Sequence, residues 1–166
     1  MKHWLPVIVA VLALAGAADS IYMTLAHYNV ISTAKVESSG ACPLTGKTCA
    51  TVISSPQSTV AGVPHAALGI GYFLLLTAAA LWRIRSGRWF APWETLALVA
   101  VGFVWSAYLT NELMNLHIPC PYCLTAHFLN AVIVVLYAFS LRADEARGTT
   151  RDARGPLHLL LRKLAR

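Results

Sequence analysis

Residues 120–141 read CPYCLTAHFLNAVIVVLYAFSL: two cysteines separated by two residues, followed at once by an apolar run without an acidic residue, a lysine or an arginine. The run from Cys123 to Leu141 approaches the roughly 20 apolar residues that an α-helix needs to cross a bilayer. This stretch therefore predicts a transmembrane helix with a cysteine pair in its first turn.

Three other segments have the same apolar character, at about residues 5–27, 63–82 and 93–113. Of the 166 residues, 57% are hydrophobic and 12% are charged, whereas a soluble domain carries roughly 25% charged residues. The first segment also resembles a secretory signal, but its apolar character resumes after Asp19, so we expect it to be retained. The sequence predicts an all-α integral membrane protein, a four-transmembrane-helix bundle capped by an extracytoplasmic loop at residues 28–62.

The basic residues predict how the bundle is oriented. The net charge is +6, and eleven of the thirteen Lys and Arg residues precede the first span, separate the second from the third, or follow the fourth. Only Lys35 and Lys47 lie in the loop at residues 28–62. Because basic residues concentrate on the cytoplasmic side, we expect both termini to be cytoplasmic, with residues 142–166 as a basic tail, in a cell inner (plasma) membrane. The charge is thus assigned to membrane flanks rather than to nucleic acid.

All four cysteines then lie on the extracytoplasmic side, which is oxidising in bacteria. Cys120 and Cys123 stand where free backbone N–H groups and the helix dipole stabilise a thiolate, and Pro121 suits a first helical turn. Soluble glutaredoxins use the same four letters, but within a βαβ unit. Cys42 and Cys49 lie in a Gly- and Pro-containing loop and form either a structural disulfide or the second dithiol of an electron relay. A zinc site of four cysteines is a further alternative, although the spacing of Cys42 and Cys49 fits it poorly.

A relay requires an electron acceptor, and the chain has no dinucleotide-binding fingerprint or haem attachment motif. A lipid-soluble quinone, menaquinone or ubiquinone, fits a thiolate at the edge of the hydrocarbon, and no metal is expected. Polar and aromatic side chains within the spans are the candidates for its pocket. His127 lies one helical turn after Cys123 and therefore on its face. The other candidates are His65, Tyr72, Trp105 and Tyr108, together with Asp19, Tyr22 and Asn130, which also lie within or near the spans.

The arrangement resembles the vitamin K epoxide reductase family, specifically its bacterial members. The resemblance covers about residues 5–141 and rests on the four spans and the order of the two cysteine pairs. The DsbB family does the same chemistry with four spans, but carries its CxxC in the first outward loop, whereas here it follows the third span. The local matches are Ser54-Ser55-Pro56-Gln57, Gly62-Val63-Pro64 with Gly69, and Cys120-Pro121-Tyr122-Cys123.

The resemblance implies roles for individual residues. Cys120 and Cys123 would be the active-site pair, with Cys123 beside the quinone, while Cys42 and Cys49 would shuttle electrons from an external thiol to Cys120. Ser55 matches a family serine near the active site. Two positions depart from the pattern at the quinone contacts, because His65 replaces an asparagine of many members and His127 replaces a tyrosine of the vertebrate enzymes.

The sequence is therefore interpreted as a membrane thiol oxidoreductase that reoxidises a secreted thioredoxin-like or DsbA-like partner and reduces a quinone. Many bacterial relatives carry a fused thioredoxin-like domain, and the residues after Leu141 are too few to form one, so we expect a partner in trans. Three alternatives stay open: a structural four-span protein with two stable disulfides, a DsbB-type oxidase by convergence, and reduction of vitamin K epoxide itself.

Overall fold

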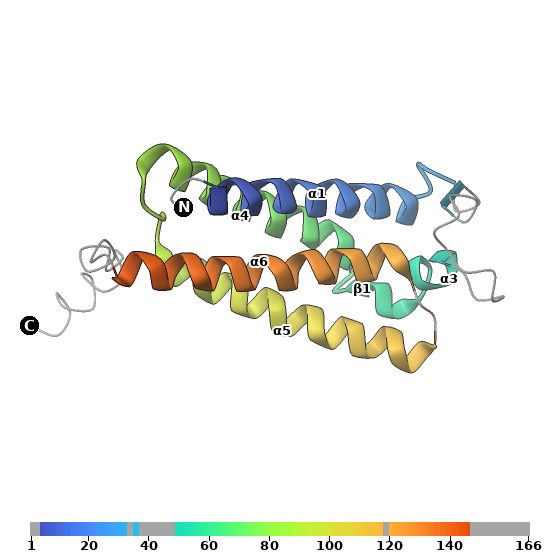
Figure 1. Ribbon diagram of the computed structural model, residues 1–166. Helices are drawn as coiled ribbons and strands as arrows, with labels where there is room; N and C mark the ends of the chain where they lie inside the picture. The colour runs from blue at the N-terminus through green and yellow to red at the C-terminus, as the bar shows by residue number, and fades with distance from the viewer. Residues whose placement is uncertain (1–3, 33–34, 37–48, 118–119, 147–166) are drawn as a thin grey trace, which may run out of the picture.

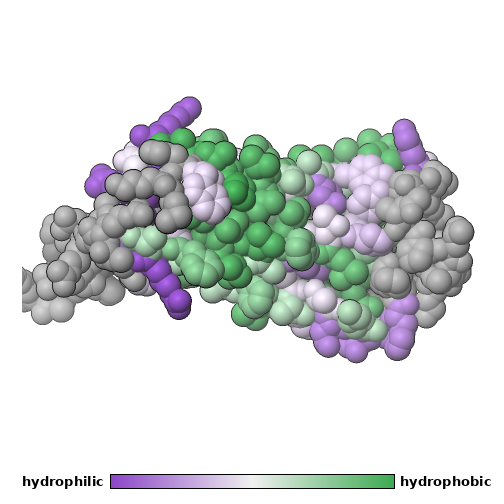
Figure 2. Space-filling model, viewed as in Figure 1, coloured by the Kyte–Doolittle hydropathy of each residue, from purple (hydrophilic) through white to green (hydrophobic). Residues whose placement is uncertain are grey.

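In the computed structural model, the chain is described for residues 4–32, 35–36, 49–117 and 120–146. Within these residues four long helices pack side by side (Figure 1), each long and apolar enough to cross a membrane. Figure 2 shows the corresponding surface, with hydrophobic residues around the middle of the bundle and hydrophilic residues toward both ends. The predicted all-α membrane bundle is confirmed. Its helices are α1 (Trp4–His27), α4 (His65–Ser86), α5 (Pro92–Leu116) and α6 (Pro121–Ala146).

Short elements lie together at one end of the bundle, beyond the end of α1 and the beginning of α6 (Figure 1). Their first helix is tied to α1, because His27 Nδ1 lies 2.9 Å from the carbonyl oxygen of Ile53. These contacts agree with a loop that covers the helix ends, although residues 37–48, which include Cys42, lie outside the described residues. The elements are α3 (Cys49–Ile53), the 3-10 helix η1 (Pro56–Ser58), β1 (Thr59–Val60) and β2 (Val63–Pro64).

The helix of the second span begins two residues after Val63, the approximate start that the sequence suggests. Val63 pairs with Val60 in an antiparallel two-stranded ribbon, and the turn between them is formed by Ala61 and Gly62, both with positive φ. Two positive φ angles in a two-residue connection are typical of the tight turn that matches strand twist. The backbone is therefore extended through Pro64, and the helix begins at His65.

Small residues allow α1 and α4 to pack closely. A Cβ added to Gly16 of α1 would lie 2.6 Å from the ring of Phe73 in α4, so only glycine fits beneath that ring. Ala13 and Ala17 of α1 are buried in the same core cluster. Close packing of small residues drives helix association in lipid, where burial of apolar surface contributes little. The contact holds α1 and α4 together and leaves α5 in contact mainly with α6.

The opposite end of the bundle is fixed by polar contacts that the sequence did not predict. Arg83 and Arg85 were expected in the loop between the second and third spans, but α4 continues to Ser86. The Arg83 guanidinium turns inward and forms a 2.9 Å ion pair with Asp144 of α6, and both side chains are buried. Beside them, Trp89 Nε1 donates a 3.0 Å hydrogen bond to Ser140 Oγ. The opposite charges of Arg83 and Asp144 compensate each other, and this allows the guanidinium to be buried.

The ion pair yields a stability prediction. Asp144→Leu should lower the stability of the detergent-solubilised protein by roughly 3 kcal/mol, because it leaves a buried unpaired guanidinium. Replacing both partners, Arg83→Met with Asp144→Leu, should restore most of the loss, and Arg85→Met at the exposed helix end serves as the control. Thermal unfolding followed by circular dichroism measures all three. A double variant as unstable as Asp144→Leu alone would contradict this account.

Candidate active site

Cys120 caps the N-terminus of α6. Its carbonyl accepts the N–H of Leu124 at 3.0 Å, the first bond of the helix, and its sulfur accepts the backbone N–H of Cys123 at 3.4 Å. The Cys123 thiol is hydrogen-bonded to Cys120, with the two Sγ atoms 2.7 Å apart. Both cysteines are free thiols. The hydrogen bond from Cys123, followed by those from backbone N–H groups, lowers the pKa of Cys120 below its ordinary value, as expected at a helix N-terminus.

Cys49 lies in the same buried cluster as Cys120. Cys49 is the first residue of α3, is disulfide-bonded, and is almost fully buried, as Cys120 is. Both pack among side chains from α1 and from the end of α5, including Met23 and Leu113. The fold thus brings a cysteine of the capping loop and the CxxC pair to the same end of the bundle, while Cys42 lies outside the described residues.

A cavity of about 490 Å³ opens beneath these cysteines, between α1, α4, α5 and α6. Cys123 reaches its wall, whereas Cys120 does not line it. Ile53, Gln57 and Ser58 of the cap line its outer end. Its size falls within the range of small-molecule sites, and its lining is mostly apolar with a few polar groups, as such sites require.

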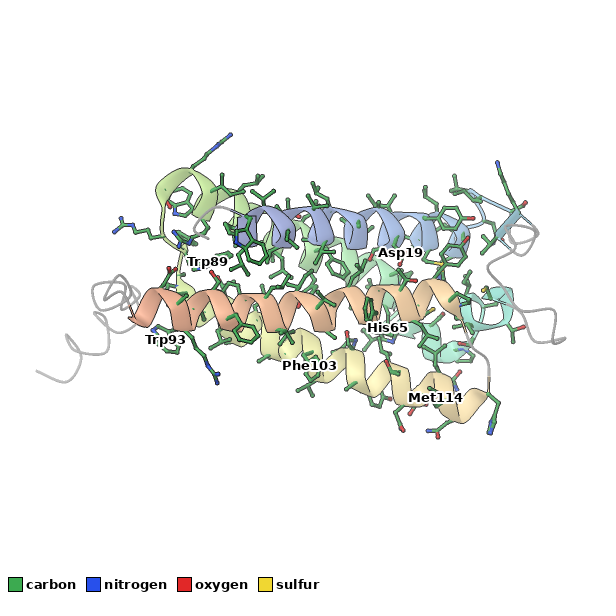
Figure 3. The ribbon with its side chains drawn as sticks, in the orientation of Figure 1. Asp19, His65, Trp89, Trp93, Phe103 and Met114 are labelled. Carbon is green, nitrogen blue, oxygen red and sulfur yellow. The ribbon has the colours of Figure 1, made fainter. Side chains whose placement is uncertain are left out.

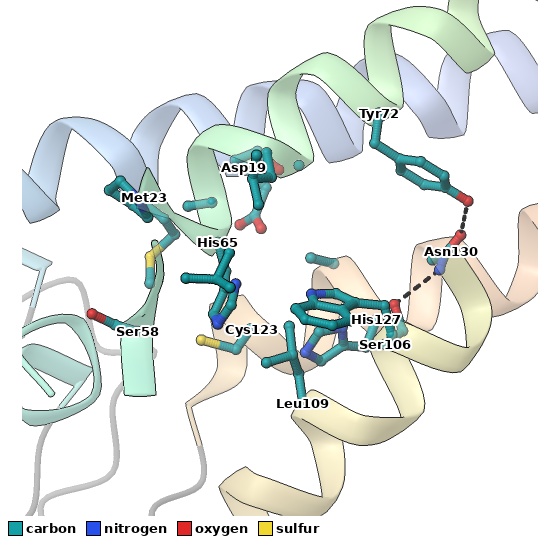
Figure 4. A pocket seen from close by; sticks show the side chains of 18 of the residues that line it. Asp19, Met23, Ser58, His65, Tyr72, Ser106, Leu109, Cys123, His127 and Asn130 are labelled. Carbon is teal, nitrogen blue, oxygen red and sulfur yellow. Dashed lines mark hydrogen bonds between the residues drawn. The ribbon is translucent and has the colours of Figure 1, made fainter. Parts of the chain in front are cut away.

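Two histidines from different helices face this cavity beside Cys123 (Figure 4). His65, in the first turn of α4, meets the indole ring of Trp105 edge to face, with ring centroids 5.6 Å apart. The buried Nδ1 of His65 has no hydrogen-bond partner among the described residues. His127 lies one turn along α6 from Cys123 and also lines a groove between α5 and α6. The cavity therefore offers imidazole groups close to a thiol.

An acidic side chain faces the same space from α1. Asp19 lines the cavity, and no ion pair within the described residues involves it. Its carboxylate lies close enough to act electrostatically on both Cys120 and Cys123. Figure 3 places Asp19 and His65 in the half of the bundle that carries the cap, away from Trp89 and Trp93. A carboxylate at membrane depth is costly and indicates a functional site.

The deep end of the cavity carries a chain of hydrogen bonds across three helices (Figure 4). The hydroxyl of Tyr72 in α4 donates to Oδ1 of Asn130 in α6 at 2.7 Å. The Nδ2 of Asn130 donates in turn to Oγ of Ser106 in α5 at 2.9 Å. Asn130 is 2% exposed, so these bonds satisfy an amide that would otherwise be buried without partners.

The structure brings most of the predicted pocket residues together. Ser55 lies at the cap end of the cavity, where its hydroxyl donates to the carbonyl of Val52 at 2.8 Å. Tyr108 does not line the cavity; its exposed ring packs on Trp105, with centroids 5.7 Å apart. The members that line the cavity are His65, His127, Ser55, Tyr72, Trp105, Asp19 and Asn130.

Sequence reasoning missed Ser106 altogether. A serine within an apolar helix is inconspicuous, because it satisfies its hydroxyl on the helix backbone or a neighbour at little cost. The sequence feature that could have indicated Ser106 is the helical spacing of Gly102, Ser106 and Leu109. These residues line the cavity from one face of α5.

A family model described as the vitamin K epoxide reductase family matches residues 7–138, most of the chain. The chain belongs to the vitamin K epoxide reductase family. No match was found among curated proteins or among solved structures. Members of this family are membrane thiol-disulfide oxidoreductases that use quinone-type electron carriers, and the free dithiol beside an apolar cavity fits that chemistry. Within the described residues, no cluster of three or more His, Cys, Asp or Glu side chains has the arrangement of a metal site.

The hydrogen bond between the two thiols predicts how Cys120 titrates. Cys123→Ser keeps a donor beside Cys120, whereas Cys123→Ala removes it. The pKa of Cys120 should therefore be higher in the alanine variant than in the serine variant. Thiolate absorbance as a function of pH measures it, with Cys49 left in its disulfide. Equal midpoints in the two variants would show that Cys123 does not stabilise the Cys120 thiolate.

Proposed function

We propose that the protein oxidises a secreted thioredoxin-like or DsbA-like thiol protein and passes the electrons to a membrane quinone, menaquinone or ubiquinone. The observation that supports this most directly is the position of the CxxC pair. Cys120 packs with Cys49 of the cap, and Cys123, hydrogen-bonded to Cys120, reaches the apolar cavity. One dithiol thus contacts both the capping loop and the space for a lipid-soluble ring.

In this proposal the electrons move by thiol-disulfide exchange until the last step. A partner dithiol reduces the disulfide that we assign to Cys42 and Cys49, and the partner leaves with a disulfide of its own. The Cys49 thiolate then attacks Cys120 of the Cys120–Cys123 disulfide, which releases the Cys123 thiol and forms a mixed disulfide. Cys42 resolves this mixed disulfide by attacking Cys49, so the Cys42–Cys49 disulfide forms again and the Cys120 thiol is released. The resulting Cys120–Cys123 dithiol then forms its own disulfide, giving up two electrons and two protons, and the quinone takes up both to become a quinol. The loop faces the extracytoplasmic side of the inner membrane, where such partners occur, and both termini are cytoplasmic.

The two protons need acceptors and donors within the cavity. Asp19 acts on both sulfurs, and we assign it the proton that Cys123 releases. His65, with its unpartnered Nδ1, and His127 are placed to give a proton to the ring oxygen next to Cys123. An imidazole group can accept or donate a proton near neutral pH, which suits this role.

The proposal is tested with purified protein, a quinone and a reduced thioredoxin-like donor, with quinone absorbance as the readout. Cys123→Ala should abolish quinone reduction. Cys42→Ala should block reduction driven by the protein donor but keep reduction driven by dithiothreitol, which reaches the Cys120–Cys123 disulfide directly. Equal turnover in Cys123→Ala and in the unaltered chain would refute the electron route.

The structural alternative, two stable disulfides without turnover, predicts a different result in the same experiment. Its cysteines would resist mild dithiothreitol and would not be reoxidised by quinone. The remaining alternative, reduction of vitamin K epoxide, is tested by offering the epoxide in place of the quinone. Both substrates would be reduced by the same dithiol, Cys120 and Cys123.

The role of Asp19 yields a separate prediction. Asp19→Asn keeps the shape of the side chain but cannot take up a proton, so the rate of quinone reduction should fall at least tenfold, with KM for the quinone nearly unchanged. Its pH profile should flatten relative to the unaltered chain, while Asp19→Glu should recover part of the rate. The other titratable groups that line the cavity remain in both variants: His27, His65, Tyr72, Glu112, Cys123 and His127. An unchanged rate and pH profile in Asp19→Asn would remove Asp19 from the mechanism.

A further inference from the structure

The hydrogen bonds at the deep end of the cavity run in one direction. Tyr72 donates to the amide oxygen of Asn130, and the amide nitrogen of Asn130 donates to Ser106. The oxygen of Ser106 is therefore an acceptor in this chain, and its own hydroxyl hydrogen is the free end. Each donor in such a chain polarises the next, so the last hydroxyl becomes a better donor than an isolated serine.

The free end lies where a bound molecule can reach it. Ser106 lines the main cavity and also the groove between α5 and α6. Asn130, which holds Ser106, lies about one helical turn beyond His127 on α6. Cys123, His127 and Asn130 therefore follow one another down the cavity wall, with the reactive thiol at one end and the hydrogen-bond chain at the other.

Tyr72 fixes the position of this chain. A Cβ on Gly102 of α5 would lie 2.5 Å from the Tyr72 ring, so the ring rests against the backbone of α5 at this point. Its hydroxyl is bound to Asn130 at the same time. The Tyr72 ring is thus confined between α4 and α5, and this fixes the position of the hydrogen-bond chain at the floor of the cavity.

We propose that Ser106 is a substrate-positioning residue that donates a hydrogen bond to the oxygen of the quinone ring farthest from Cys123, with Tyr72 and Asn130 acting through it. This inference rests on the proposed function. The two oxygens of a para-quinone lie at opposite ends of its ring, about one helical turn apart. A contact at each oxygen extends this span to the roughly two turns that separate Cys123 from Asn130. One oxygen lies beside Cys123 and the histidines, and the other meets Ser106. The cavity thereby selects rings with two opposite oxygens and holds them in one orientation.

The test measures quinone affinity directly, through quenching of tryptophan fluorescence, since Trp105 lines the cavity. Ser106→Ala should weaken binding by roughly three- to tenfold, the effect of one lost hydrogen bond, and raise KM similarly, with kcat changed less than twofold. Thr110→Val is the matched control, because the Thr110 hydroxyl donates to the carbonyl of Ser106 within α5 and does not line the main cavity. Ser106→Thr keeps a hydroxyl and should bind more tightly than Ser106→Ala.

A double-variant cycle separates positioning from mere stability. If Tyr72 acts through Ser106, then Ser106→Ala should cost less affinity in a Tyr72→Phe background than in the unaltered chain. Full additivity, or an unchanged affinity in Ser106→Ala, would overturn the inference. Failure of the unaltered chain to bind quinone would overturn the inference and the quinone route together, whereas binding without thiol-driven reduction would overturn the proposed function alone.

Discussion

Cys120 occupies the N-cap of α6, and this position decides what the cysteine pair can do. An N-cap side chain accepts hydrogen bonds from the first turn of its helix, so the sulfur of Cys120 is stabilised as a thiolate by groups that the helix must leave unpaired anyway. In a membrane helix the same first turn is also the boundary between the cap and the lipid-facing cavity. The next cysteine, three residues on, therefore reaches the cavity without any special backbone geometry.

The two ends of the bundle are built in different ways. At the end opposite the cap, the Arg83–Asp144 ion pair and the Trp89–Ser140 hydrogen bond join α4, α6 and the connection before α5. At the cap end, the cavity lies between α1, α4, α5 and α6, and α4 and α5 make few direct contacts. The contacts at the end opposite the cap hold the helices in register. The cap end can therefore leave room for a ligand between the helices.

The sequence could predict the parts that depend on composition and short-range spacing. Four apolar runs define four helices because lipid leaves the backbone no other partners, and CxxC before an apolar run places the thiols at a helix start. The inward turn of Arg83 could not be predicted, because it depends on Asp144, 61 residues away. The same holds for Ser106, whose significance comes from partners on two other helices. Tyr108 shows the reverse: it lies in the right span but faces away from the cavity.

The hydrogen-bond chain at the cavity floor pairs polar groups that lie deep within the bundle. Unpaired polar groups within a bundle are costly, and the amide of Asn130 would be the most expensive of them. Tyr72 and Ser106 give the oxygen and the nitrogen of that amide one hydrogen bond each within the bundle, and the hydroxyl hydrogen of Ser106 is left to meet a ligand. Near Cys123 the situation differs, because within the part of the chain that the structure describes His65 Nδ1 has no hydrogen-bond partner and Asp19 has no ion-pair partner. The polar groups to which we assign proton transfer thus differ from those at the floor, which are already hydrogen-bonded to one another, and in the proposed function the quinone ring lies between these two sets.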